Sequence, residues 1–126
     1  METSDTYDYV VRAVDTATFG RVLLNARGHH LVVDGPPSNG CPGEAITPAE
    51  LFLGGVAACA AELVHVIARD EGIDLAGVEA EMGGRVDRAH EVRADVTVFR
   101  SVRLRLTLRG VTDEQGATLV KLFKGR

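Results

Sequence analysis

The segment from Thr47 to Glu71 constrains the fold of this chain more than any other. Residues 47–50 (TPAE) place threonine at the N-cap, proline at the first helical position and glutamate at N3, which is the pattern of a capping box. The residues that follow are apolar on nearly every side of a helix as far as Ala61, and such helices are buried inside proteins. We therefore predict a buried helix from Pro48 to about Glu71, with Gly72 as its C-terminal stop.

This predicted helix is long for so small a protein. At 1.5 Å per residue it extends about 36 Å, and a chain of 126 residues can hardly cover it on all sides. The pair Gly54-Gly55 costs roughly 1 kcal/mol of helix stability per glycine relative to alanine, which indicates that another backbone packs close to it. We infer that a second copy of the chain covers the far side of the helix.

The remaining sequence predicts strands and one shorter helix. The expected strands are Tyr7–Val14, Arg21–Ala26, His29–Asp34, Leu75–Val86 and Val98–Leu108. Arg27-Gly28 is expected to form a tight hairpin turn, residues 35–46 a loop rich in proline and glycine, and Gly83-Gly84 a bulge or bend. A second capping box at residues 112–115 opens a C-terminal helix that carries Leu119, Leu122 and Phe123.

This order of elements predicts an α+β fold in a single domain over residues 1–126. An antiparallel sheet would cover the long buried central helix and the second, C-terminal helix. In Val98–Leu108, apolar residues alternate with arginine and threonine, so this strand should have one buried and one solvated face.

Composition excludes several classes of function. The formal net charge of -4 argues against a nucleic-acid binder, and the arginines at 100, 103, 105 and 109 are interpreted as the wet face of one strand. The apolar run of residues 51–61 is too short to span a membrane, and the polar N-terminus does not resemble a signal peptide. With only two cysteines, we expect a cytoplasmic protein with reduced thiols and no membrane partner.

Cys59 is the main candidate for chemistry, and the residues leave two interpretations open. Its neighbours at helical spacing, Phe52, Val56, Leu63 and Val66, form an apolar stripe, which fits an inert buried thiol. A reactive thiol would instead need an arginine or histidine nearby to favour the thiolate. Cys41 lies in the proline- and glycine-rich loop and is either incidental or a disulfide partner of Cys59.

Glu50 already serves the capping box. It precedes Cys59 by nine positions, or about 13–14 Å along a helix, so it could assist that thiol only across a dimer interface or through an intermediate group. The histidines and cysteines lack the spacing of a metal site, so no metal and no cofactor are expected.

Residues 47–63, TPAELFLGGVAACAAEL, resemble the signature of the OsmC/Ohr superfamily, and the order of elements resembles it over nearly the whole chain. The resemblance implies an intertwined homodimer that reduces organic hydroperoxides, with Cys59 at the peroxidatic position. It further implies that the oxidised cysteine is resolved as a disulfide and then reset by a dithiol reductant, often a lipoyl group.

Three features depart from that pattern. The family's resolving cysteine follows the last helix in a Cys-Pro pair, and this sequence ends at Arg126, where that pair would begin. Either that cysteine lies beyond Arg126, or the protein lacks it and Cys41 could substitute for it. In the best-known branch a glutamate stands where this chain has Ala49, and here the carboxylate is Glu50. The arginine that holds the thiolate corresponds most nearly to Arg21, or otherwise to Arg27.

The expected catalytic residues are therefore Cys59, Glu50 and Arg21. The alternative is a non-catalytic relative, in which the same dimer binds a small apolar ligand or serves as a stress-linked structural protein. A third hypothesis is an RNA-contacting role for the arginine strand, and the negative net charge disfavours it.

Overall fold

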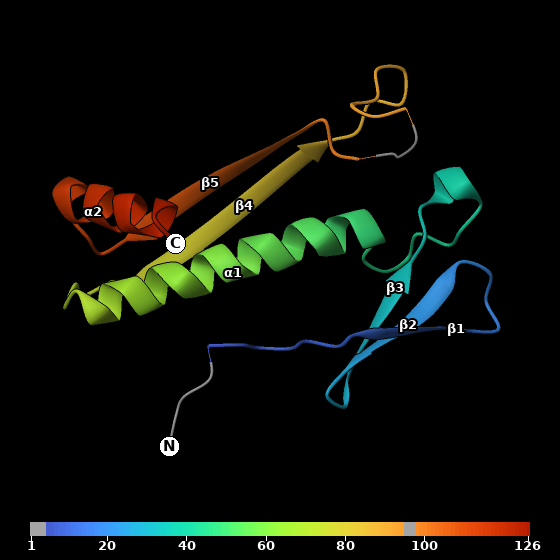
Figure 1. Cartoon of the computed structure of the whole chain (residues 1–126), viewed down its shortest axis with the longest axis horizontal. Coiled ribbons are helices and arrows are strands. Elements are labelled where there is room, and N and C mark those ends of the chain that lie inside the picture. Colours follow the sequence, from blue (N-terminus) through green and yellow to red (C-terminus); the bar gives the residue numbers. More distant parts are fainter. Residues whose placement is uncertain (1–4, 95–97) are drawn as a thin grey trace. The chain divides into compact units, whose positions relative to one another are not determined.

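The computed structural model describes residues 5–94 and 98–126 and divides the chain into two compact units. One unit ends at Leu51 and the other begins at Phe52, inside the long helix. The elements in chain order are β1 (Arg12–Asp15), β2 (Arg21–Ala26), β3 (His29–Asp34), a 3-10 turn (Pro37–Asn39), α1 (Pro48–Asp70), β4 (Gly77–Arg85), β5 (Ser101–Arg109) and α2 (Asp113–Lys124) (Figure 1). The predicted α+β class is confirmed, although the strands form two antiparallel sheets and not one.

The first unit contains a three-stranded antiparallel sheet in the order β1-β2-β3. Arg27 and Gly28 both have positive φ, 52° and 80°, which is the conformation of a type I′ hairpin turn and confirms the predicted one. The prediction was wrong for the first strand, which begins at Arg12 and not at Tyr7. The physical reason is pairing: β2 offers partners only to Arg12–Asp15, and the residues before them have none in this sheet.

The loop after β3 is folded back against the sheet by backbone hydrogen bonds. The Asp34 N–H donates to the Ile46 carbonyl at 3.0 Å, and the Gly35 N–H donates to the Gly20 carbonyl at 2.7 Å. The 3-10 turn interrupts the segment predicted as loop, and Gly40 closes it in a left-handed conformation. The loop is therefore ordered at both ends by the hairpin from which it departs.

Both ends of α1 use local sequence signals. The Glu50 carboxylate accepts from the Thr47 N–H at 3.0 Å, and the Glu50 N–H donates to the Thr47 hydroxyl at 3.3 Å, which confirms the capping box. At the other end, Gly72 (φ 67°) donates to the Arg69 carbonyl and Ile73 donates to the Ala68 carbonyl. These two bonds make a Schellman motif, so the predicted stop at Gly72 is confirmed.

The burial predicted for α1 holds for only part of its surface in the single chain. Its second half places Ala60, Val64, Ile67 and Ala68 in the core. In its first half Phe52 is 62% exposed and Val56 is 40% exposed. In one chain α1 is thus covered on one face only, because the second unit supplies apolar partners to that face alone; this agrees with the expectation that so short a chain cannot cover the helix on all sides, and the covering by a second copy stays a prediction.

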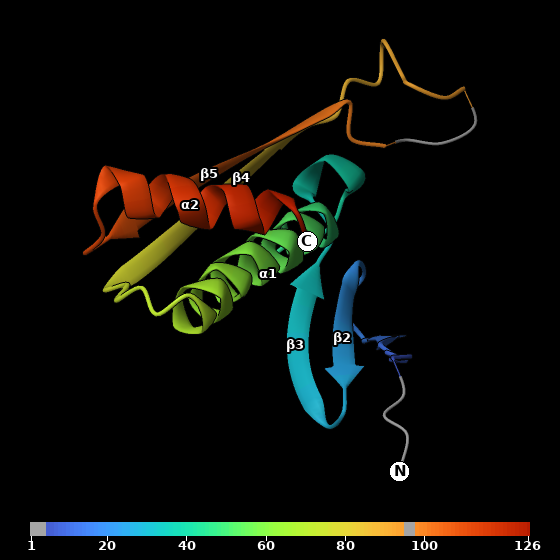
Figure 2. The same cartoon turned by 60° about the vertical axis from the view of Figure 1, so that its left-hand side comes forward.

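The second unit packs both helices against the two-stranded sheet of β4 and β5 (Figure 2). Leu119 of α2 is fully buried beside Val64 and Ile67 of α1, and Leu106 and Leu108 of β5 pack against this cluster. The predicted alternation of β5 is confirmed at Leu104, Leu106 and Leu108, which are half-buried between exposed residues, but Val102 is exposed.

The glycine pair in β4 does not form the predicted bulge. The pairing of β4 with β5 runs without interruption, with Gly83 opposite Arg103 and Gly84 opposite Val102. A Cβ atom at Gly84 would lie 2.8 Å from ring carbons of Phe99 and 3.2 Å from Leu53. Glycine is required here because two apolar side chains lie against the backbone, and not because the strand bends.

By length and composition alone, α1 could cross a membrane. The core helix of a small domain has the same character, and α1 packs Val64 and Ile67 into such a core.

Candidate functional site

Cys59 lies near the middle of α1 and is a free thiol. The side chain is exposed in the single chain, whereas the adjacent Ala60 is 2% exposed. In one chain Cys59 is therefore not buried, and whether its thiol is reactive stays a prediction. A thiol on the surface can meet a substrate or a second subunit.

The surface on the N-terminal side of Cys59 is apolar, whereas the exposed Glu62 lies three positions further along the helix. On α1 its neighbours at helical spacing include Val56 and Phe52 on the N-terminal side, both exposed. The Phe52 ring stacks on Phe99, with the ring centroids 5.8 Å apart and the planes inclined by 24°. Phe99 was not singled out in the sequence, because nothing in its local pattern shows which residue it will meet. The exposed apolar face of α1, defined here as Phe52, Val56 and Cys59, is typical of a surface that is covered in an assembly.

Glu50 is bound to its own helix N-terminus. Its carboxylate accepts hydrogen bonds from the Thr47 N–H at 3.0 Å and from the Thr47 hydroxyl at 2.8 Å. These two bonds lower the pKa of Glu50 from its ordinary value. The carboxylate is therefore an anion at neutral pH, and the nine helical positions to Cys59 exclude direct contact within one helix.

Arg21 is held in a bidentate ion pair with Asp34, its neighbour across the β2–β3 ladder. Its Nε donates to one carboxylate oxygen at 2.7 Å and its Nη2 to the other at 2.8 Å. Nη2 also lies 3.3 Å from the exposed Glu44 carboxylate. The Nη1 atom of Arg21 makes no hydrogen bond to the part of the chain that the structure describes.

Asp34, which holds the candidate residue Arg21, was not among the site residues predicted from the sequence. It has no exposed surface, and besides Arg21 it accepts from the Glu44 N–H at 2.9 Å and the Ala45 N–H at 3.1 Å. The hydrogen bonds from Arg21, together with those from the two backbone amides, lower the pKa of Asp34 to about 2. The same pair raises the pKa of Arg21 above its ordinary value. An aspartate directly after the apolar run Leu31–Val33 was the available signal.

Cys41 lies between two glycines of the first unit. A Cβ atom at Gly20 would be 2.4 Å from the Cys41 sulfur, and one at Gly35 would be 2.5 Å from it. Gly20 and Gly35 directly flank Arg21 and Asp34 in sequence, so the thiol lies close to that ion pair. Cys41 is free and half-buried, and both cysteines of the chain are therefore unpaired in this structure.

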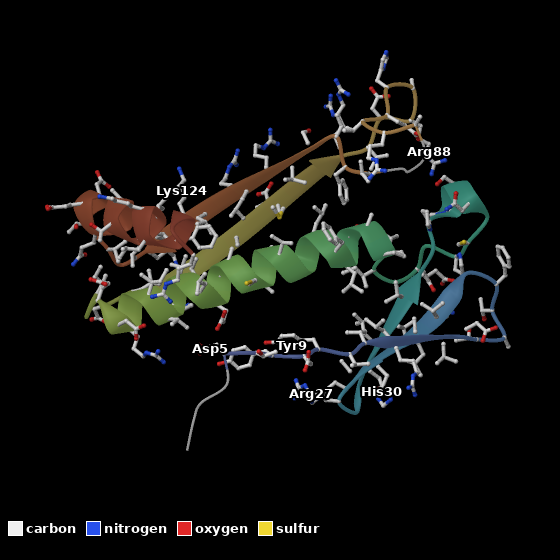
Figure 3. All side chains as sticks on the ribbon, in the orientation of Figure 1. Asp5, Tyr9, Arg27, His30, Arg88 and Lys124 are labelled. Atoms are coloured by element: carbon white, nitrogen blue, oxygen red, sulfur yellow. The ribbon has the colours of Figure 1, made fainter. Side chains whose placement is uncertain are left out.

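Arg27, the second arginine considered, occupies the exposed β2–β3 turn beside His30 (Figure 3). The structure thus places Arg21 and Glu50 with local partners, and it leaves Cys59 on the exposed apolar face of α1. In residues 5–94 and 98–126 no three histidine, cysteine or acidic side chains are grouped so that they could hold a metal ion.

Comparison with known proteins relates the chain to one family. The family described as OsmC-like protein matches residues 41–125, and no match is found among curated proteins. An OsmC like protein from Mycoplasma pneumoniae superposes with a TM-score of 0.81 at 14% identity, covering 98% of this chain and 84% of the other. The organic hydroperoxide resistance protein OsmC of Legionella pneumophila gives 0.71 at 22% identity, covering 95% and 84%.

An organic hydroperoxide resistance protein from Elizabethkingia anophelis gives a TM-score of 0.73 at 17% identity, covering 98% of this chain and 84% of the other. At these identities the solved structures establish the shared fold. The family match extends over more than half of the sequence and includes α1, both strands of the second sheet and α2. The chain therefore belongs to the family of OsmC-like proteins.

Proposed function

We propose that this protein is a thiol-dependent reductase of organic hydroperoxides that uses Cys59 as its attacking group. The observation that carries the proposal is a free, exposed cysteine on an apolar helix face in a chain of a family whose solved relatives are named for hydroperoxide resistance. An apolar surround favours a hydroperoxide with a hydrocarbon substituent over hydrogen peroxide.

The reaction needs only the thiol and an external dithiol. The Cys59 thiolate attacks one peroxide oxygen, a sulfur–oxygen bond forms, the oxygen–oxygen bond breaks, and the departing alkoxide takes a proton to leave as an alcohol. The sulfenic acid then condenses with a second thiol, which forms a disulfide and releases water. A dithiol reductant, such as a lipoyl group, returns Cys59 to the thiol by exchange.

Arg21 is the proposed cationic partner of the thiolate, since such a group is needed to favour the charged form. Two of its nitrogens are bound to Asp34, which fixes the direction of the guanidinium, and its Nη1 donors are left for a peroxide oxygen or the thiolate sulfur. In this proposal Asp34 is a positioning residue. Glu50 would act across a subunit interface or through an intermediate group.

A homodimer is part of the proposal. Phe52 and Val56 are exposed beside Cys59, and a second copy that covers them would exclude water from the thiol. Exclusion of water strengthens the attraction between a thiolate and a guanidinium. Cys41 is the proposed second thiol of the disulfide, and the proposed location is the cytoplasm.

The test is oxidation of the reduced protein by one equivalent of cumene hydroperoxide, followed by intact-mass and peptide mass spectrometry. We expect Cys59 to gain one oxygen or to appear in a disulfide. The Cys41→Ser variant is the matched control: it should still form the sulfenic acid at Cys59 but should not pass to an intramolecular disulfide. A Cys59 that remains a thiol under these conditions would contradict the proposal.

The second candidate is a non-catalytic dimer that binds a small apolar ligand. It is favoured because the two residues expected to assist Cys59 already have partners: Arg21 is ion-paired with Asp34, and Glu50 caps α1. Steady-state consumption of hydroperoxide with a dithiol separates the two candidates. Turnover that is lost in a folded, dimeric Cys59→Ser variant excludes the non-catalytic one.

A further inference from the structure

In the part of the chain that the structure describes, two arginines at one end of the β4–β5 sheet have no acidic partner. Arg85 ends β4, and Arg103 lies near the start of β5. Neither guanidinium makes an ion pair or a side-chain hydrogen bond within residues 5–94 and 98–126. Unpaired arginines that lie close together repel each other. An anion bound between two arginines on one face would offset this repulsion.

The strand register places these residues on the same face. Gly83 is directly opposite Arg103, and Arg85 is directly opposite Ser101. Because side chains alternate along a strand, all four belong to one face of the sheet. Arg85 and Arg103 are diagonal neighbours, whose Cα atoms are about 7–8 Å apart in such a ladder. Their long side chains can therefore converge on one group between them.

A cavity of about 280 Å³ lies at this point, lined by Gly83, Gly84, Arg85, Ser101, Val102 and Arg103. The floor over Gly83 is open, since a Cβ atom there would meet nothing within 4 Å. A Cβ atom at Gly84 would meet Phe99 and Leu53, and neither of these lines the cavity. The cavity is therefore on the face of the sheet that points away from Phe99, Leu53 and the helical core.

We propose that this cavity, the Arg85–Arg103 cavity, binds the phosphate group of a small molecule. Guanidinium groups donate pairs of parallel hydrogen bonds to oxyanions, and Ser101 adds a hydroxyl donor from the facing strand. A phosphate has about two negative charges and three strong acceptor oxygens, which suits two guanidinium groups and one hydroxyl. A carboxylate offers two oxygens in one plane and a single charge.

The surrounding charges favour a small ligand over a long polyanion. Glu81 lies directly opposite Arg105, the next outward residue of β5, and Glu79 lies opposite Thr107. These carboxylates would face the continuing backbone of a nucleic acid and repel it, and the whole chain has a net charge of -4. Arg88 lies in the loop that follows β4 (Figure 3), where its charge is offset by the adjacent Asp87.

The experiment is a titration of the full ¹⁵N-labelled chain with sodium phosphate at pH 7, with sodium chloride adjusted to hold ionic strength constant. We expect saturable shifts of the amide signals of Gly83 and Ser101 and of the Nε–H signals of Arg85 and Arg103. Acetate at matched ionic strength tests a carboxylate and should shift these signals much less. A titration with glycerol phosphate distinguishes a phosphate ester from free phosphate as the preferred source.

Variants separate a site from a general field of positive charge. Arg103→Gln and Arg85→Gln should each weaken phosphate binding about ten- to hundredfold, the loss expected for a charge-assisted hydrogen bond. Arg105→Gln, which removes the same charge one step along β5, should change it less than about twofold. Gly83→Val fills the open floor without altering charge and should also weaken binding.

Three results would overturn the proposal. They are shifts that grow linearly with phosphate and do not saturate, equal losses in the Arg103 and Arg105 variants, and undiminished binding in a folded Gly83→Val variant. Circular dichroism and the thermal midpoint of each variant establish that it is folded, so a loss of binding cannot be attributed to unfolding. The oxidation of Cys59 is measured separately and does not decide this proposal.

Discussion

Replacement of Phe52 by alanine tests whether the exposed apolar face of α1 is the subunit interface. Phe52 is 62% exposed in one chain. An aromatic side chain buries roughly 150–250 Å² in a protein core or interface, so about 120 Å² of Phe52 is free, and alanine removes about 100 Å² of it. At about 25 cal/mol per Å², this area contributes about 2.5 kcal/mol when it is covered.

In a symmetric dimer the same residue contributes once from each subunit. The free energy of association of the two subunits should therefore weaken by about 5 kcal/mol in the Phe52→Ala variant, which raises the dimer Kd by between three and four orders of magnitude. Sedimentation velocity over a range of protein concentrations measures this change. Val92→Ala is the matched control, since Val92 is 58% exposed but lies in the loop after β4.

The substitution also removes the stacking of Phe52 on Phe99 within one chain, which contributes about 0.5–1.5 kcal/mol. A Phe99→Leu variant removes the stacking and leaves Phe52 in place, so its thermal midpoint measures that part alone. If folded Phe52→Ala protein dissociates at the same concentration as the Val92→Ala control, Phe52 does not lie in a subunit interface. The covering of α1 would then come from something other than a second copy.

Two further changes probe the structure of each unit. Asp34→Asn removes the carboxylate whose pKa is lowered to about 2 from an ordinary 3.8. The lowered pKa stabilises the fold fully above about pH 4, and this stabilisation is lost as the pH falls toward 2. The difference in stability between wild type and variant should therefore shrink over that interval, as measured by acid unfolding followed by circular dichroism. A constant difference from pH 7 to pH 2 would contradict this. Leu119→Ala empties a fully buried position in the second unit and should reduce the free energy of unfolding in urea by about 2–5 kcal/mol; a loss below 1 kcal/mol would mean that the cluster repacks.

Local signals predicted the elements that depend on local bonds. The capping box at Thr47 and Glu50 and the stop at Gly72 fixed both ends of α1 to within one residue. The Arg27-Gly28 turn formed as expected, because its conformation depends on the two residues themselves. The first strand began late and the Gly83-Gly84 bulge did not form, since both outcomes depend on which segment lies alongside.

The candidate site was predicted only in part. Cys59 and its apolar neighbours followed from helical periodicity, and the structure adds that this face is exposed in one chain. The pairing of Arg21 with Asp34 joins residues thirteen positions apart, so no local spacing could reveal it. The partner of Phe52 is equally remote in sequence, at Phe99.

The sequence by itself determined where α1 and α2 begin, where the β2–β3 hairpin turns and how Leu104, Leu106 and Leu108 of β5 alternate with exposed residues, because caps, turns and alternation act between near neighbours. Only the tertiary structure decided that Asp34 is buried against Arg21, that Gly84 makes room for Phe99, and that Arg85 and Arg103 lie on one face of the β4–β5 sheet without an ion pair to the described residues. Those arrangements depend on contacts between segments distant in sequence, and the free energy of such contacts is set by the whole packed fold.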